Sequence, residues 1–413
     1  MDGHRDADEG TLGLVLTGGG ARAAYQVGVL LGIREILAQA GAMPGCLPFQ
    51  VVCGTSAGAI NAMALACRAD VFDESLDALS DVWFDMRAEQ VYRTKALDMA
   101  STGARWLTML VAGWALYRGK RKRLVRPSAL FDNAPLADLL RRMIDFQRVE
   151  RELDTGRLRA VAIAASDYSS GRHVTFYESR RIVEPWVRSQ RIAVADRITV
   201  EHLLASSAIP FLFPAASLPL DGARAWFGDG SMRQIAPISP AIHLGAERIL
   251  VVGAGQLNAP NRFVPPPGAN GDASYPSLAQ IAGHAMSSIF LDALAMDIER
   301  LERINRTVSL IAPGERAQSP LRAIEVLVIA PSQRIDTIAA RHVGALPRTV
   351  RALLRVIGAT EAKGAALASY LLFESSFTRE LMDLGFNDTL ARTADVLKFF
   401  RVQTPVPGTP VPA

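Results

Sequence analysis

The sequence predicts an α/β protein built in three α/β/α layers, with a mainly parallel central sheet and a helical extension at the C-terminal end. Two strand–turn–helix units follow one another between residues 12 and 68. Further apolar runs, typical of buried parallel strands, recur up to about residue 255. Beyond residue 277 the apolar residues mostly follow helical spacing.

The first unit starts with an apolar run at Leu12–Leu16, which ends in Thr17 and the three glycines Gly18, Gly19 and Gly20. Residues 21–39 then have the composition of a helix rich in Ala, Leu and Ile. The second unit has the same order, with a strand at 49–53, a turn at 54–58 and a helix at 59–68. Two such units in succession favour parallel strands covered by helices on both faces.

The later segments first complete the predicted sheet and then become mostly helical. Buried strands are predicted at 159–165 and 248–253, and shorter strands at 173–177 and 223–227. A loop dense in Pro, Gly and Asn at 258–276 indicates a boundary. We therefore expect one domain over residues 12–255, a mostly helical region over 277–400 with one strand-like run at 324–330, and flexible tails at 1–10 and 404–413.

The composition excludes several classes of protein. Among 413 residues, 49% are hydrophobic and 21% charged, which is typical of a globular chain and not of a disordered or fibrous one. The three cysteines, Cys46, Cys53 and Cys67, have neither zinc-site nor disulfide-framework spacing, so we expect a reducing compartment and no metal or other cofactor. The 45 basic and 41 acidic residues nearly balance, so a nucleic-acid partner is not expected.

No targeting or membrane-spanning segment is predicted. The acidic N-terminus lacks the basic and apolar regions of a secretory signal, and no apolar run reaches the length that crosses a bilayer. We expect a cytoplasmic protein that is soluble or bound peripherally to a membrane.

The second turn has the pattern G-x-S-x-G, with Ser56 between Gly54 and Gly58. Between a strand and a helix, these glycines permit a sharp turn that exposes the serine hydroxyl at the carboxyl end of the strand. The following helix directs its N-terminal N–H groups toward a developing oxyanion. Taken alone, the pattern fits a structural turn equally well.

The triple glycine before the first helix is a second signal. Its N–H groups are unshielded by any Cβ and suit a phosphate or an oxyanion. No Gly-Lys-Ser/Thr follows, and the acidic residue of a dinucleotide site is missing, so an oxyanion hole or a plain connection remains. A base for Ser56 is harder to find, because none of the six histidines has a convincing catalytic setting; Asp229, in the turn Gly228–Ser231, is the better candidate.

The ordered set of motifs resembles the patatin-like phospholipases, serine lipid acyl hydrolases that use a Ser-Asp dyad. The set comprises Gly18–Arg22, then Gly54–Gly58 followed by Ala59-Ile60-Asn61, then residues 205–210 (ASSAIP) with Phe213-Pro214, and finally Asp229-Gly230. The resemblance covers about residues 12–255 and not the helical C-terminal region. Thr17, Ala23 and Ser231 depart from the usual family residues beside the motifs.

The resemblance implies a patatin-like catalytic domain with Ser56 as nucleophile and Asp229 as its base. It also implies oxyanion donors from the backbone N–H groups of Gly18, Gly19, Gly20, Ala21 and Arg22. The expected substrates are phospholipids or lysophospholipids at a peripheral membrane surface, cleaved through an acyl-serine intermediate. Three alternatives stay open: a Ser-His-Asp esterase using a histidine such as His243, a catalytically altered lipid-binding or scaffold protein, and acyl transfer to an alcohol.

Residues 106–117 form a twelve-residue, largely apolar run that precedes a basic cluster. Such a run is too short to span a bilayer, but aromatic residues and basic groups favour a membrane interface. The sequence therefore predicts either a membrane-docking or lid helix or a buried helix with a solvated basic end. The membrane contacts would be Trp106, Trp114, Arg121, Lys122 and Arg123.

Overall fold

The computed structural model describes residues 10–94, 129–256, 276–289, 293–312, 314–319, 321–356, 358–359 and 364–402. The predicted membrane contacts within 106–123 and both predicted tails, apart from Gly10, lie outside these residues. The strands are β1 (Leu12–Leu16), β2 (Val51–Thr55), β3 (Ala160–Asp167), β4 (His173–Ser179), β5 (Val187–Arg188), β6 (Arg191–Ala195), β7 (Ala216–Leu220), β8 (Ala223–Asp229), β9 (Arg248–Val252) and β10 (Glu325–Ile329).

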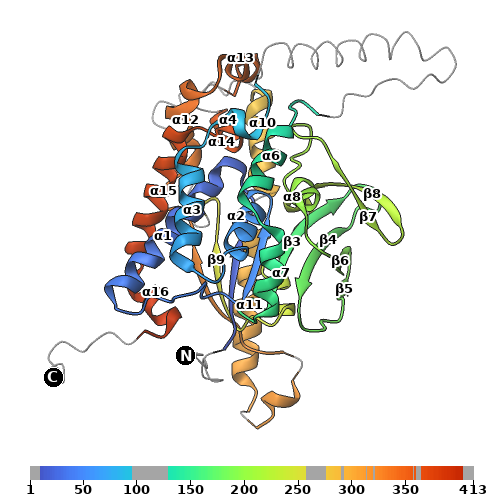
Figure 1. The fold of residues 1–413 in the computed structure, drawn as a ribbon, viewed down its shortest axis with the longest axis vertical. Coiled ribbons are helices and arrows are strands. Elements are labelled where there is room, and N and C mark those ends of the chain that lie inside the picture. Colours follow the sequence, from blue (N-terminus) through green and yellow to red (C-terminus); the bar gives the residue numbers. More distant parts are fainter. Residues whose placement is uncertain are drawn as a thin grey trace.

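One mixed, mostly parallel sheet runs through the molecule in the order β10-β9-β1-β2-β3-β4-β6-β5 (Figure 1). The five strands from β10 to β3 are all parallel, and their register places Leu14 beside Val52 and Leu250. Beyond β3, strand β4 is antiparallel, and the β7–β8 hairpin pairs with the last residues of β3. Strands β1, β2 and β9 bury side chains on both sides, because helices cover both faces of the sheet.

The helices are α1 (Ala24–Gln39), α2 (Ala57–Ala66), α3 (Phe72–Phe84), α4 (Ala88–Val91), α6 (Ala134–Met143), α7 (Phe146–Asp154), α8 (Val200–Ser206), α9 (Ser239–His243), α10 (Leu278–Ser287), α11 (Ala293–Leu310), α12 (Ile335–His342), α13 (Arg348–Val356), α14 (Ala365–Leu371), α15 (Ser375–Leu390) and α16 (Thr393–Phe400). Short 3₁₀ turns follow β1 (η1, Gly20–Ala23) and β8 (η2, Gly230–Arg233); two others lie at Arg316–Gln318 and Val343–Ala345.

Two hydrophobic clusters define the layers on the two faces of the sheet. Side chains such as Leu14 and Val52 pack against α1, α2, α3 and α15 on one face. The alternate residues Val15 and Val51 pack against α9 and α11 on the other. The predicted α/β class, with a mostly parallel sheet and a helical C-terminal region, is confirmed.

The C-terminal region shares this sheet and packs on its helices. The strand-like run predicted at 324–330 is β10, which pairs in parallel with β9. Helix α15 lies along α1, and their backbones meet closely: a Cβ on Gly28 would be 1.9 Å from the Met382 carbonyl oxygen, and one on Gly385 would be 2.2 Å from that of Tyr25. Only glycine fits at this crossing.

The boundaries differ slightly from those predicted around the two turns. Strand β2 is shifted to 51–55, since Gly54 and Thr55 continue the ladder with β3 instead of forming a turn. Helix α2 therefore begins directly after Ser56, at Ala57. The first helix is preceded by the single 3₁₀ turn η1, so α1 starts at Ala24 and not at residue 21.

Candidate active site

Ser56 is the single residue between β2 and α2, and its backbone is strained. Its φ of 56° and ψ of −131° lie outside the conformations that non-glycine residues prefer. The Ser56 N–H donates to the Ser206 Oγ at 2.9 Å, which holds the turn from the side of α8. Strain at a residue held this firmly is typical of a functional position.

Gly58 permits the turn to approach the end of β1. A Cβ on Gly58 would lie 2.3 Å from the Leu16 carbonyl oxygen and 2.5 Å from that of Thr17, so any side chain would force α2 away. Gly54 lies within β2, where a Cβ would be 2.4 Å from the Gly58 carbonyl oxygen. Both flanking glycines of the motif thus permit a close backbone approach, Gly58 to the end of β1 and Gly54 to the start of α2.

Asp229 lies at the end of β8 and contacts Ser56 directly. The Ser56 Oγ donates to the Asp229 Oδ2 at 2.6 Å, and the Ser231 N–H donates to the Asp229 Oδ1 at 2.9 Å. Asp229 is fully buried and Ser56 is 1% exposed. Burial raises the pKa of the Asp229 carboxyl to about 6, although the hydrogen bonds from Ser56 and Ser231 act in the opposite direction.

The predicted oxyanion turn lies beside the serine. Gly20 has φ of +56° and lines the same cavity as Ser56. Within the described chain, no acceptor receives the N–H of Gly19 or Gly20, whereas the Arg22 N–H donates to the Gly19 carbonyl at 3.1 Å. Arg22 is therefore engaged inside the turn, and Gly19 and Gly20 retain N–H groups that can serve a ligand.

Helix α14, in the C-terminal region, packs against this turn. The Arg22 Nε donates to the Ser369 Oγ at 2.7 Å, its Nη2 donates to the Ala366 carbonyl at 3.3 Å, and its guanidinium lies 4.0 Å from the Tyr370 ring centroid. A Cβ on Gly20 would lie 2.3 Å from the Tyr370 carbonyl oxygen. The turn is thus shaped by residues more than 340 positions away, which no sequence motif indicated.

A buried chain of amides ties the turn to α2 and α3. The Gln26 Nε2 donates to the Thr17 carbonyl at 2.7 Å, and the Asn61 Nδ2 donates to the Gln26 Oε1 at 2.9 Å and to the Ala23 carbonyl at 3.2 Å. The Trp83 Nε1 donates to the Asn61 Oδ1 at 2.8 Å. The glycine turn, the serine helix and Trp83 therefore form one connected unit.

The cavity in front of Ser56 is strongly apolar and holds about 530 Å³ of atom-free space, including its open mouth. Its walls come from α2, α3, α4, α6, the segment after α8, and Phe373, which follows α14. The apolar lining residues are Ile60, Val82, Trp83, Met86, Val91, Leu136, Leu139, Met143, Ile209, Phe213 and Phe373. Sequence reasoning named only Ile60, Ile209 and Phe213 among them, as parts of the family motifs and not as cavity residues. It missed the others, because they come from separate segments that no motif marks. A cavity of this chemistry accepts an alkyl chain.

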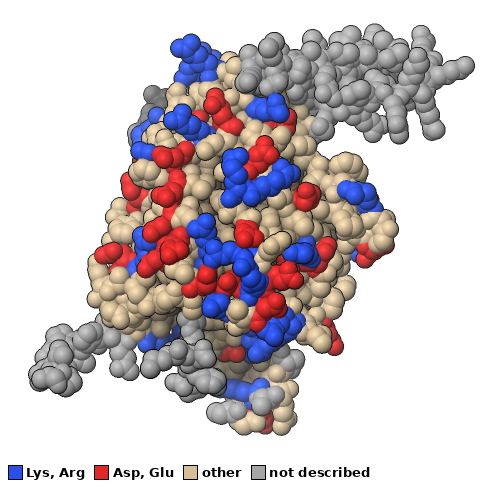
Figure 2. All heavy atoms as spheres, in the orientation of Figure 1, with Lys and Arg blue, Asp and Glu red and all other residues tan. Residues whose placement is uncertain are grey.

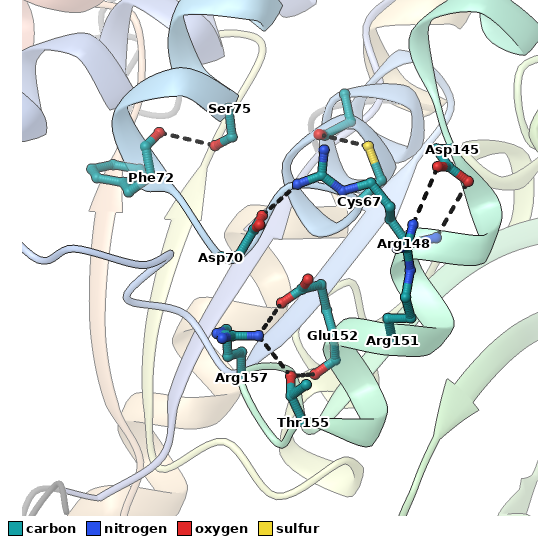
Figure 3. Close-up of polar contacts among 11 residues, drawn as sticks. Cys67, Asp70, Phe72, Ser75, Asp145, Arg148, Arg151, Glu152, Thr155 and Arg157 are labelled. Atoms are coloured by element: carbon teal, nitrogen blue, oxygen red, sulfur yellow. Dashed lines mark hydrogen bonds and ion pairs between the residues drawn. The ribbon is translucent and has the colours of Figure 1, made fainter. Parts of the chain in front are cut away.

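Helix α7, which follows the α6 wall, is fastened to the end of α2 (Figure 3). Arg148 donates to Asp70 at 2.6 Å, just beyond α2. Asp145 caps α7 by accepting the N–H groups of Gln147 and Arg148 at 3.0 and 3.3 Å. These contacts hold the α6–α7 pair against the serine helix.

The histidines that the structure describes are not part of this contact. His243 is on α9, under the opposite face of the sheet from α2, and stacks on Trp186 at 4.6 Å. His173 is buried, and burial lowers its pKa to about 4, an effect that the charge of Arg191 reinforces and the Gly230 backbone opposes. Among the described residues, no histidine hydrogen-bonds to Ser56, and no group of three or more His, Cys, Asp or Glu side chains could hold a metal.

The patatin-like phospholipase family model matches residues 14–242, more than half of the chain. The chain belongs to this family. No curated protein matches the chain in sequence, and no helix within the described ranges is long and apolar enough to cross a membrane.

Several solved structures match this patatin-like chain at low sequence identity. Human GIVD cytosolic phospholipase A2 matches with 12% identity and a TM-score of 0.45, over 97% of this chain and 61% of that protein. VipD from Legionella pneumophila matches with 12% identity and a TM-score of 0.26, over 91% and 67% of the two chains. ExoU of Pseudomonas aeruginosa, in complex with SpcU, matches with 14% identity and a TM-score of 0.25, over 96% and 80%. The chain thus spans about three fifths of the length of the human enzyme.

Proposed function

We propose that this patatin-like protein is a serine hydrolase that cleaves acyl esters of phospholipids or lysophospholipids through an acyl-Ser56 intermediate. The single observation that carries the proposal is the 2.6 Å hydrogen bond from the Ser56 Oγ to the Asp229 Oδ2 beside an apolar cavity. Hydroxyl and carboxylate are within proton-transfer distance. The cavity suits the acyl chain of such an ester.

In the first half-reaction, the Ser56 Oγ attacks the ester carbonyl carbon while its proton passes to the Asp229 Oδ2. The C–O bond to the leaving alcohol then breaks, and the alcohol takes the proton from Asp229. The acyl group stays on Ser56 as an ester. Because Asp229 is fully buried and its pKa is raised to about 6, it is a stronger base than an exposed carboxylate, yet it is ionised at neutral pH.

The negative charge that develops on the carbonyl oxygen needs preorganised donors. The N–H groups of Gly19 and Gly20 have no acceptor within the described chain, and Ala57, at the first position of α2, also lines the cavity. The N-terminal N–H groups of a helix are free to bind an anion. Each donor contributes on the order of 3 kcal/mol to transition-state stabilisation.

In the second half-reaction, Asp229 takes a proton from a water molecule, which attacks the acyl carbon. The bond between the acyl carbon and the Ser56 Oγ then breaks, the Ser56 Oγ takes the proton from Asp229, and the fatty acid is released. An alcohol acceptor in place of water would make the protein an acyltransferase with the same dyad. Comparing free fatty acid with transferred ester among the products, with and without added glycerol, separates these outcomes.

The test of the proposal is labelling with a fluorophosphonate probe, followed by mass spectrometry of the labelled peptide. The expected result is modification of Ser56 in the wild type and no labelling in Ser56→Ala. The reaction should be repeated with detergent so that a closed entrance cannot hide the serine. A folded wild type that stays unlabelled under both conditions favours the lipid-binding alternative, and labelling at another serine rejects the assigned nucleophile.

A further inference from the structure

We propose that the adjoining ends of α10 and α13 form a docking surface for an anionic lipid bilayer. We call this surface the docking face and define it by Leu278, Ile281, Arg348, Arg355 and Val356. The inference rests on the proposed function, because the bilayer is the source of the substrate. It concerns residues that no part of the dyad or cavity uses.

The aliphatic part of the docking face lies where the two helices meet. Gly358, just beyond α13, touches Ser277, the residue that caps α10: a Cβ on Gly358 would lie 2.9 Å from the Ser277 Cβ. Next to this contact, Leu278 is 70% exposed and Val356 is 84% exposed, and Ile281 follows one turn along α10 at 46%. Large aliphatic side chains gathered on a surface mark a site of interaction.

The charge on the docking face has one sign. Arg348, Arg351 and Arg355 recur at intervals of three and four residues, so they lie on one side of α13. Neither α10 nor α13 contains Asp or Glu. In the part of the chain that the structure describes, these arginines form no ion pair, although the Arg351 Nη1 donates to the Gly344 carbonyl. Figure 2 shows Lys and Arg side chains at this upper end of the molecule.

The docking face is at the same end of the molecule as the candidate active site (Figure 1). Helix α10 packs on α14, and α14 packs on the glycine turn η1. On the other side, the Thr349 Oγ1 of α13 donates to the Thr94 carbonyl at 2.5 Å, three residues beyond Val91 in the cavity wall. A bilayer bound here is therefore brought to the end at which Ser56 lies.

The size and chemistry of the docking face favour a bilayer over a protein partner. A stable protein interface buries roughly 800 Å² on each side, whereas three aliphatic side chains with two exposed guanidinium groups form a smaller set. Reversible membrane binding needs only a few inserted aliphatic side chains and coulombic attraction to anionic headgroups. The two features occur together on α13, where the exposed Val356 directly follows Arg355.

The experiment measures co-sedimentation with vesicles in a Ser56→Ala background, so that hydrolysis does not alter the lipid. Vesicles contain phosphatidylcholine alone or mixed with phosphatidylglycerol. The double variant Arg348→Glu/Arg355→Glu should bind the mixed vesicles roughly 30-fold more weakly. The matched control is Arg303→Glu/Arg306→Glu on α11, which makes the same charge change at exposed positions away from the docking face and should bind like its parent.

A second variant, Leu278→Ser/Val356→Ser, tests the aliphatic part and should bind roughly 10-fold more weakly to the mixed vesicles. All variants must melt within a few degrees of their parent. Equal binding by the arginine variant and the α11 control would overturn the docking face, as would failure of the parent to bind phosphatidylglycerol vesicles.

Failure of the docking face can be told apart from failure of the proposed hydrolase. With Ser56 restored, hydrolysis of a soluble short-chain ester should be the same in wild type and docking variants, while hydrolysis of vesicle lipid falls in the variants. If the wild type cleaves neither substrate, the proposed function fails, and the vesicle-binding result still decides the docking face. If the soluble ester also reacts more slowly in the variants, the substitutions have perturbed the site and a docking role is rejected.

Discussion

Ser56 and Asp229 are separated by 173 positions in the chain, yet their side chains share a 2.6 Å hydrogen bond in a fully buried pocket. Two strand ends make this contact. Strand β2 delivers Ser56 at its carboxyl end, and β8, paired with the end of β3, delivers Asp229. The position of the base is therefore fixed by the sheet and not by a mobile loop, which favours a preorganised dyad.

The first prediction concerns loss of the dyad. Ser56→Ala and Asp229→Asn should each lower kcat/KM for a soluble ester by about 10⁴-fold or more, because one removes the nucleophile and the other its base. Initial rates on a p-nitrophenyl ester, together with circular dichroism to check the fold, measure this. Retention of near-normal activity by either folded variant would contradict the dyad.

The second prediction is the pH dependence of the reaction. The Asp229 pKa is about 6, and only the carboxylate accepts the Ser56 proton. The value of kcat/KM should therefore rise about tenfold per pH unit below 6 and level off above about 7. A pH–rate profile with a soluble ester tests this; activity that is flat or declining between pH 5 and 7 would show that a different group is the base.

The third prediction concerns the effect of the raised Asp229 pKa on the stability of the fold. In the folded protein the Asp229 pKa of about 6 lies above the ordinary value of 3.8. Between pH 3.8 and 6, the folded protein therefore keeps a proton on Asp229 that the unfolded chain has released. The free energy of unfolding therefore falls as pH rises through this window, by on the order of 3 kcal/mol in all. A neutral Asn at position 229 does not titrate, so Asp229→Asn avoids this loss of stability.

Accordingly, Asp229→Asn should melt a few degrees above the wild type near pH 7.5, and the difference should shrink to nothing near pH 4. Thermal unfolding at both pH values measures it, with Ser56→Ala as the control that removes the hydroxyl but keeps the carboxylate. A variant that melts below the wild type at the higher pH would mean that the buried carboxylate stabilises the fold.

Local sequence patterns predicted the turns of the candidate site, but they did not predict which residues line its cavity. Patterns of apolar runs and glycines predicted β1, β2 and the helices after them, because such turns depend on neighbouring residues. Resemblance to the family supplied Asp229, which a common Asp-Gly turn could not mark by itself. The strand β10 was expected within the helical region, because nothing in its short apolar run says which strand it will pair with.

The contacts that sequence reasoning missed are long-range. Ser206 meets the Ser56 N–H across 150 positions, and α14 meets Arg22 across more than 340. No rule of sequence spacing predicts these partners, because the packing of whole helices and strands brings them together. Phe373 enters the cavity wall for the same reason, as part of the helical region beyond the family motifs.

The fourth prediction concerns Ser206, whose Oγ accepts the Ser56 N–H at 2.9 Å in a fully buried position. Ser206→Ala leaves that N–H without an acceptor, at a cost of about 1–3 kcal/mol, and lets the strained turn relax. We expect kcat to fall about 10- to 100-fold with a smaller change in KM. Ser75→Ala on α3 is the matched control, because its buried Oγ donates to the Phe72 carbonyl within its own helix and not to the turn. Equal kinetics for the two variants would remove the positioning role of Ser206.

The last prediction concerns the close approach of α2 to β1. The 2.3 Å separation between a Cβ on Gly58 and the Leu16 carbonyl oxygen cannot be relieved by a rotamer, because the obstacle is backbone. Gly58→Ala must therefore shift α2, destabilising the fold by on the order of 3 kcal/mol and moving Ser56 away from the glycine turn. Gly45→Ala, where a Cβ meets no atom within 4 Å, should change stability by less than about 0.5 kcal/mol.

Urea unfolding and ester hydrolysis of the two glycine variants separate stability from geometry. If Gly58→Ala is destabilised but its folded fraction hydrolyses esters at the wild-type rate, the distance between Ser56 and the glycine turn is not critical, and other donors must bind the oxyanion. If it loses both, the contact between α2 and β1 sets the geometry of the site. Wild-type stability for Gly58→Ala would contradict the close approach itself.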